Sequence, residues 1–112
     1  MLRDTVLMWQ RDEISNPPEQ FRDFSERVRD AREQVEASGA KTPLAVSSGG
    51  AIGQTVAEIT GGPADQMIAL QLQVKNCAVA RFVMSRNGTW LHGFNETPHI
   101  DAANQDEMLT YS

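Results

Sequence analysis

Apolar side chains recur every three or four residues over most of the first 38 positions, a spacing that places them on one face of a helix. The pattern predicts a short amphipathic helix over residues 2–12 and a long helix over residues 19–38, separated by Pro17 and Pro18. Gly39 is the expected C-cap of the long helix. Charges of both signs fill the other faces of the long helix, which is typical of a solvated surface rather than of a binding patch.

An apolar run at residues 44–46 follows and ends in a Ser/Gly-rich turn. Because the run shows no alternation of polar and apolar residues, it predicts a strand buried on both faces, as in a parallel sheet covered by helices. Helical spacing resumes over residues 50–59, and another helix is expected from Pro63 to about residue 72. The sequence of elements is therefore strand, loop and helices.

From residue 76 the hydrophobic period changes to two. Residues 77–84 and 89–94 are predicted to be antiparallel strands joined by a turn at residues 85–88, which contains an Asn-Gly pair. We interpret Cys77 as a small buried hydrophobe on the first of these strands. Residues 102–112 are polar and are expected to form a frayed tail of a single domain that spans residues 1–112.

Composition narrows the possible partners. The 112 residues contain 40% hydrophobic residues, enough for one core, and carry 10 basic against 15 acidic side chains, so that we expect no nucleic-acid partner. No apolar run approaches the roughly 20 residues that span a bilayer, so we expect no membrane partner. The single cysteine agrees with a reducing compartment, and we expect a cytoplasmic location.

The candidate chemistry lies in Ser47, Ser48, Gly49 and Gly50. Glycines let a ligand approach the backbone, and the following helix directs free N–H groups and the positive end of its dipole at an anion. The stretch lacks both the Gly-Lys-Ser/Thr of a nucleotide loop and the three-glycine dinucleotide spacing. A structural turn and an anion-binding loop both remain open, and a serine nucleophile would need a base beside it.

The other chemically active side chains give weaker signals. His92 and His99 lie seven residues apart without a third ligand at metal spacing, so we expect structural histidines, no metal site and no cofactor. Glu96 and His99 could in principle form an acid/base pair. Trp9 and Trp90 are expected in the core or at an interface.

Three separated stretches combine into a recognisable pattern: Leu-Ala-Val-Ser-Ser-Gly-Gly-Ala-Ile at 44–52, Asn-Cys-Ala-Val at 76–79 and Phe-Asn-Glu-Thr-Pro-His-Ile at 94–100. Together they resemble the C-terminal half of the histidine phosphatase superfamily, the phosphoglycerate-mutase-like proteins, over roughly residues 9–101. The start of the long helix at 18–24 is similar as well. The resemblance implies an α/β fold, here a partial three-layer one, and phosphomonoesterase chemistry through a phosphohistidine, with phosphate or a phosphorylated small molecule as ligand.

The chain departs from this family pattern in two places. Family members carry their nucleophile in an Arg-His-Gly motif, and a second histidine in a Ser-His-Gly-Gly loop contacts the phosphate. This sequence has no Arg-His-Gly, and Ser48 stands at the position of the second histidine. The resemblance therefore implies a truncated or degenerate member, a pseudoenzyme without catalytic residues, whose residues Ser47, Ser48, Gly49 and Gly50 keep a vestigial phosphate loop.

The departure has a consequence for partners. In the family, the strand that bears the missing motif would lie beside the strand expected at residues 44–46, so its absence leaves a sheet edge exposed. We expect a homo-oligomer or a complementing chain to cover that edge. An alternative from another class is a small interaction or regulatory module that binds a protein through this edge, and a third is a phosphate sensor that uses Gly49 and Gly50.

Overall fold

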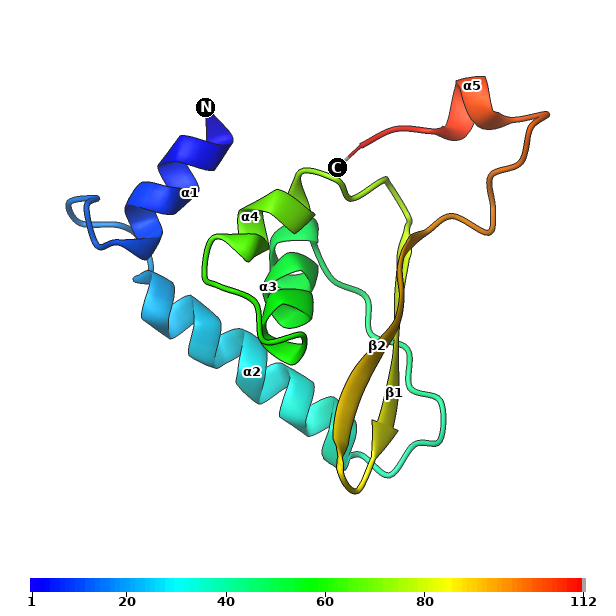
Figure 1. Ribbon diagram of the computed structural model, residues 1–112, viewed down its shortest axis with the longest axis horizontal. Helices are drawn as coiled ribbons and strands as arrows, with labels where there is room; N and C mark the ends of the chain where they lie inside the picture. The colour runs from blue at the N-terminus through cyan, green and yellow to red at the C-terminus, as the bar shows by residue number, and fades with distance from the viewer. Residues whose placement is uncertain (112) are drawn as a thin grey trace.

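The computed structural model describes residues 1–111, in which four helices precede a β-hairpin and a short terminal helix (Figure 1). The helices and strands in chain order are α1 (Leu2–Gln10), α2 (Phe21–Ala37), α3 (Gly49–Ile59), α4 (Gln66–Gln71), β1 (Val79–Ser85), β2 (Gly88–Glu96) and α5 (Gln105–Met108). Helices α3 and α4 pack side by side, α1 and α2 cover them on one side, and the hairpin lies on the other (Figure 1).

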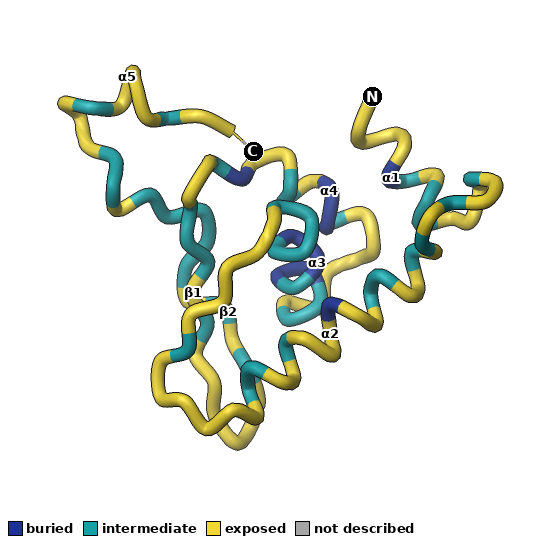
Figure 2. Tube along the Cα trace, turned by 180° about the vertical axis from the view of Figure 1, so that it is seen from behind, coloured by how far each residue is buried: buried dark blue, intermediate teal, exposed yellow. Residues whose placement is uncertain are grey.

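The core lies where α1 meets α4. Val6 of α1 and Met67 and Ile68 of α4 form its buried cluster, and Ile68 is completely inaccessible to solvent. Figure 2 shows most of the buried positions on α3 and α4, with the hairpin mostly half-buried or exposed. The helices therefore carry the hydrophobic core, as the helical spacing of the sequence predicts.

An aromatic cluster joins α1 to α2. The ring of Trp9 meets that of Phe21 edge to face, with centroids 5.2 Å apart, and lies at the same distance from Phe24. Trp9 Nε1 donates a 2.7 Å hydrogen bond to the carbonyl of Glu19. The expectation that the tryptophans lie in the core or at an interface fits half-buried Trp9, which packs against the core cluster, whereas Trp90 is 52% exposed on the hairpin.

Helices α2 and α3 are also joined by ion pairs. Glu58, near the end of α3, accepts hydrogen bonds from Arg29 at 2.6 Å and from Arg32 at 3.1 Å. Arg32 also pairs with Glu36, whose carboxylate accepts a hydrogen bond from Thr89 at the start of β2. The network therefore fixes the end of α3 and the tip of the hairpin to α2.

The predicted parallel strand at residues 44–46 is wrong. These residues have no strand partner in the described residues, and Leu44 and Val46 are 86% and 93% exposed. A strand requires a hydrogen-bonded neighbour, and the described sheet is only the antiparallel pair β1–β2. The protein is therefore a mixed α/β structure, without the three-layer parallel arrangement in the part that the structure describes.

The hairpin begins later than predicted. Cys77 is exposed and has a φ of +59°, so the prediction of a buried strand residue is wrong, and β1 starts two residues further on. The left-handed backbone at Cys77 turns the chain before it can extend. Near the C-terminus, helix α5 is followed by a bridge between Lys75 and Tyr111, so part of the expected tail has secondary structure.

Candidate functional site

The candidate site is the turn at residues 47–50, called here the 47–50 loop. Ser48 is the N-cap of α3, with extended backbone (φ −104°, ψ 163°), and its carbonyl accepts the first helical bond, from Ile52 N at 2.9 Å. Its hydroxyl makes no capping hydrogen bond. Ser47 and Ser48 are exposed, and Gly49 and Gly50 are half-buried.

The first turn of α3 leaves backbone donors free. In a helix the first N–H groups have no partner in the preceding turn, and here no other described residue accepts from Gly49, Gly50 or Ala51. Three N–H groups at the positive end of an 11-residue helix therefore have no acceptor within the described chain. This arrangement suits a small anion.

The loop has no charged side chain of its own. Residues 42–57 contain no Asp, Glu, Lys, Arg or His. An anion at the loop would be held by backbone N–H groups, by serine hydroxyls and by the helix dipole alone. The helix dipole contributes about 0.3–1 kcal/mol of this attraction for an exposed charge, and about 2 kcal/mol in favourable partly buried positions.

Helix α4 lies against the 47–50 loop through the side chain of Gln71. A Cβ built on Gly50 would lie 3.4 Å from Gln71 Oε1, so the amide of this α4 side chain borders the loop glycine. Three residues further on, a Cβ on Gly53 would lie 2.7 Å from the carbonyl oxygen of Met67, which is closer than real Cβ contacts allow. Glycine at position 53 therefore lets α3 approach α4. Gln71 could not be predicted from the sequence, because nothing in the spacing of an isolated glutamine indicates this contact.

The histidines are not connected to the loop. In the described residues, neither the His92 nor the His99 imidazole makes a hydrogen bond or ion pair, and His92 is exposed on β2. The possible acid/base pair of Glu96 and His99 is not formed, because Glu96 accepts hydrogen bonds from Arg81 at 2.6 and 3.2 Å.

Asn95 has a structural role. Its φ of +58° places it in the left-handed region, which Asn tolerates better than most residues. Its Oδ1 accepts from Lys75 N at 2.9 Å, and its Nδ2 donates to the carbonyl of Gln73 at 2.6 Å. The side chain thereby fastens the segment between α4 and β1 to the end of β2. A left-handed asparagine is detectable only once the backbone is known.

The side chains whose pKa clearly departs from its usual value lie on α2 and just before it: Glu19, Arg27 and Arg29. A side-chain hydrogen bond from Arg27 lowers the pKa of Glu19. A hydrogen bond to Glu58 raises the pKa of Arg29. These shifts belong to structural ion pairs, not to the 47–50 loop.

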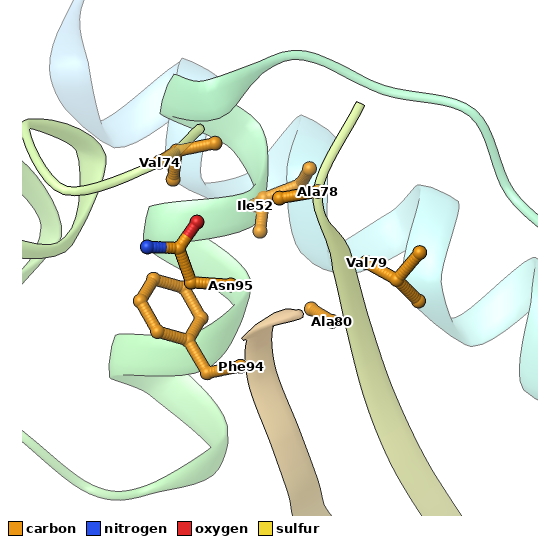
Figure 3. Close-up of a pocket in the computed structure, with 7 residues that line it drawn as sticks. All are labelled: Ile52, Val74, Ala78, Val79, Ala80, Phe94 and Asn95. Atoms are coloured by element: carbon orange, nitrogen blue, oxygen red, sulfur yellow. The ribbon is translucent and has the colours of Figure 1, made fainter. Parts of the chain in front are cut away.

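The recess nearest to α3 is too small for a substrate. Figure 3 shows it between Ile52 of α3 and Phe94 and Asn95 of β2, with Val74 and Ala78 at its border. Its volume of about 10 Å³ is about that needed for one water molecule. A phosphorylated substrate would therefore have to bind at the open surface of the loop.

A second depression lies at the other end of the helical layer. It is an open groove of about 380 Å³ between α1 and the segment that leads into α2. Its lining residues are Thr5, Val6, Trp9, Ile14, Ser15, Asn16, Pro17, Pro18 and Glu19. None of them belongs to the 47–50 loop.

In residues 1–111, no group of three or more His, Cys, Asp or Glu side chains could hold a metal ion. No helix in that range has the length and apolarity required to cross a membrane.

Comparison with protein-family models matches residues 2–97 to the family described as the histidine phosphatase superfamily, branch 1. The match covers α1 to β2 and therefore includes the 47–50 loop. Comparison with curated proteins and with solved structures gave no match.

Proposed function

Because the chain belongs to branch 1 of the histidine phosphatase superfamily, we propose that the 47–50 loop binds a phosphoryl group and that these 112 residues alone do not perform phosphohistidine catalysis. The observation that carries the proposal is that the first three backbone N–H groups of α3, behind Ser48, have no acceptor among the described residues. Backbone N–H groups and a helix dipole accommodate phosphate, but neither can act as the covalent nucleophile.

Ser48 supports the second half of the proposal. The resemblance places a phosphate-contacting histidine at this position, and a serine hydroxyl can donate one hydrogen bond but carries no positive charge. Within the described residues, no hydrogen bond or ion pair joins His92 or His99 to the loop. Phosphate binding without a cation should be weak, in the range of a millimolar Kd, which corresponds to about −4 kcal/mol.

An NMR titration with inorganic phosphate tests the binding. We expect amide shifts at Gly49, Gly50 and Ala51. The variant Ser48→His adds an imidazolium below its usual pKa of about 6.5. It should tighten phosphate binding below that pH and not above it.

The matched control is Ser15→His, which places the same imidazole on an exposed serine outside the loop. If phosphate leaves the three loop amides unmoved, or if the control tightens binding as much as the loop variant, the phosphate loop is refuted. Catalysis is scored separately with the purified protein and a generic phosphomonoester without metal. Turnover above background would refute the lack of catalysis but not the binding.

A second candidate function is that of an interaction module, and the exposed extended segment at residues 44–46 favours it. Leu44 and Val46 are among the most exposed large apolar side chains, and their backbone has no strand partner in the described residues. A strand from a second copy or from a complementing polypeptide would supply the missing hydrogen bonds.

Sedimentation over a range of protein concentrations tests self-association. We expect Val46→Lys to abolish it, and Leu2→Lys, at another exposed apolar position, to leave it intact. A protein that stays monomeric at high concentration argues against the homo-oligomer and leaves a separate complementing polypeptide as the partner to be tested by co-expression.

A further inference from the structure

The tip of the hairpin carries an asparagine followed by a glycine. Arg86 and Asn87 form the two-residue loop between the paired residues Ser85 and Gly88, and both Asn87 and Gly88 are exposed. Asn87 N donates to Ser85 Oγ at 3.2 Å, and Gly88 has a φ of +141°. A glycine presents its backbone nitrogen without a Cβ to shield it.

The protein has five asparagines, all in the described part. The amides of Asn76, Asn95 and Asn104 donate hydrogen bonds of 2.7, 2.6 and 3.1 Å. Asn16 precedes a proline, which has no N–H to react. Asn87 alone combines a side-chain amide without a hydrogen bond in the structure with a following glycine.

We infer that Asn87 and Gly88 form a self-modifying site that converts Asn87 to aspartate or isoaspartate. The deprotonated backbone nitrogen of Gly88 attacks Cγ of Asn87, a new N–C bond closes a succinimide ring, and the bond between Cγ and the amide nitrogen Nδ2 breaks to release ammonia. Water then adds to one of the two ring carbonyls. Opening at one carbonyl leaves aspartate, and opening at the other leaves isoaspartate.

The modification changes the hairpin in two ways. It adds one negative charge to a protein of net charge −5. Isoaspartate also inserts one carbon into the backbone of a loop that has only two residues between the paired Ser85 and Gly88. Thr89, the next residue, donates to Glu36 of α2, so a displaced tip releases the contact that joins the hairpin to α2.

Peptide mass mapping of the folded full-length protein after incubation at mildly alkaline pH tests the site. We expect ammonia loss and isoaspartate to accumulate in the peptide that contains Asn87, and to be absent from those with Asn76, Asn95 and Asn104. Asn87→Gln should abolish the conversion, because its longer side chain does not close the same five-membered ring. Conversion spread over all these peptides, or none at all, overturns the inference.

Hydrogen exchange tests the release of the tip. Converted protein is compared with Asn87→Asp, which adds the charge without the extra backbone carbon, and with Thr89→Val, which removes the hydroxyl bound to Glu36. We expect the isoaspartyl form to lose protection at the hairpin tip as Thr89→Val does, and Asn87→Asp to keep it. If the isoaspartyl form is protected like Asn87→Asp, the structural consequence is wrong.

Discussion

A substitution at Gly53 tests the close packing of α3 on α4, which positions α3 behind the 47–50 loop. The variant Gly53→Ala places a Cβ 2.7 Å from the carbonyl oxygen of Met67 and 3.3 Å from Gln71 N. Both neighbours are backbone atoms of α4, so relief requires the two helices to move apart. Overpacking of this kind costs about 1–3 kcal/mol.

Alanine also favours the helical state. In a helix interior it is about 1 kcal/mol more favourable than glycine, which offsets part of the clash. The expected net effect of Gly53→Ala is a loss of up to about 2 kcal/mol in the free energy of unfolding. For a domain of about 100 residues, this lowers Tm by up to roughly 16 °C.

Gly50→Ala is the matched control, because it makes the same substitution in the same helix. Its Cβ would meet only the end of the Gln71 side chain at 3.4 Å, an ordinary contact that a flexible amide can adjust. We expect this variant to be as stable as the parent or more stable, by at most about 1 kcal/mol.

Urea unfolding followed by far-UV circular dichroism distinguishes the two variants. The midpoint should fall for Gly53→Ala and hold or rise for Gly50→Ala, with the slope m unchanged in both. If Gly53→Ala is as stable as Gly50→Ala, the close packing of α3 on α4 is refuted.

Three further predictions concern hydrogen bonds and ion pairs. Asn95→Gly keeps the left-handed backbone but loses two hydrogen bonds, so it should lower the free energy of unfolding by about 1–3 kcal/mol. Asn95→Ala should lower it further, because alanine is strained in the left-handed region. Equal denaturation midpoints for the two variants would contradict this. Glu58→Ala should lower the unfolding free energy, because it removes the carboxylate that exposed Arg29 and half-buried Arg32 share and leaves Arg32 with Glu36 alone, while Glu33→Ala, at an exposed site on α2, should change it little in the same urea assay. The pKa of Glu19 lies below its usual value of 4.5 because Arg27 donates to the carboxylate, so this pair stabilises the fold above pH 4.5 and the contribution is lost as the pH falls through the lower, folded-state pKa. Glu19→Gln should remove that part of the acid dependence of Tm, and an unchanged Tm profile would speak against the pair.

Local patterns in the sequence were sufficient to predict the helices. The spacing of apolar residues places α1, α2, α3 and α4 within a few positions of where they lie, and Gly39 follows α2 with a φ of +79° as expected of a C-cap glycine. Helical periodicity is a local signal, because each turn contacts the next. The hairpin was predictable for the same reason, since its two strands are neighbours in sequence.

The strand expected at residues 44–46 depends on a partner that no local pattern specifies. Its apolar residues indicate burial on both faces, whereas the described part of the protein leaves Leu44 and Val46 almost fully exposed. The apolar residues of a segment indicate that it would be buried if a neighbouring strand were present. They do not supply the neighbour, whose hydrogen bonds make an extended segment a strand.

In the candidate site, too, the local turn could be predicted from the sequence and the contribution of distant residues could not. The Ser/Gly stretch correctly predicts a turn that leads into a helix N-terminus, because glycine and serine at an N-cap act over a few residues. The stretch 42–57 contains no histidine, so the phosphohistidine chemistry that the family resemblance implies cannot be predicted from this stretch alone. Under the proposed function, a strand that a partner supplies beside residues 44–46 would lie directly before the 47–50 loop, because Val46 and Ser47 are adjacent in the chain.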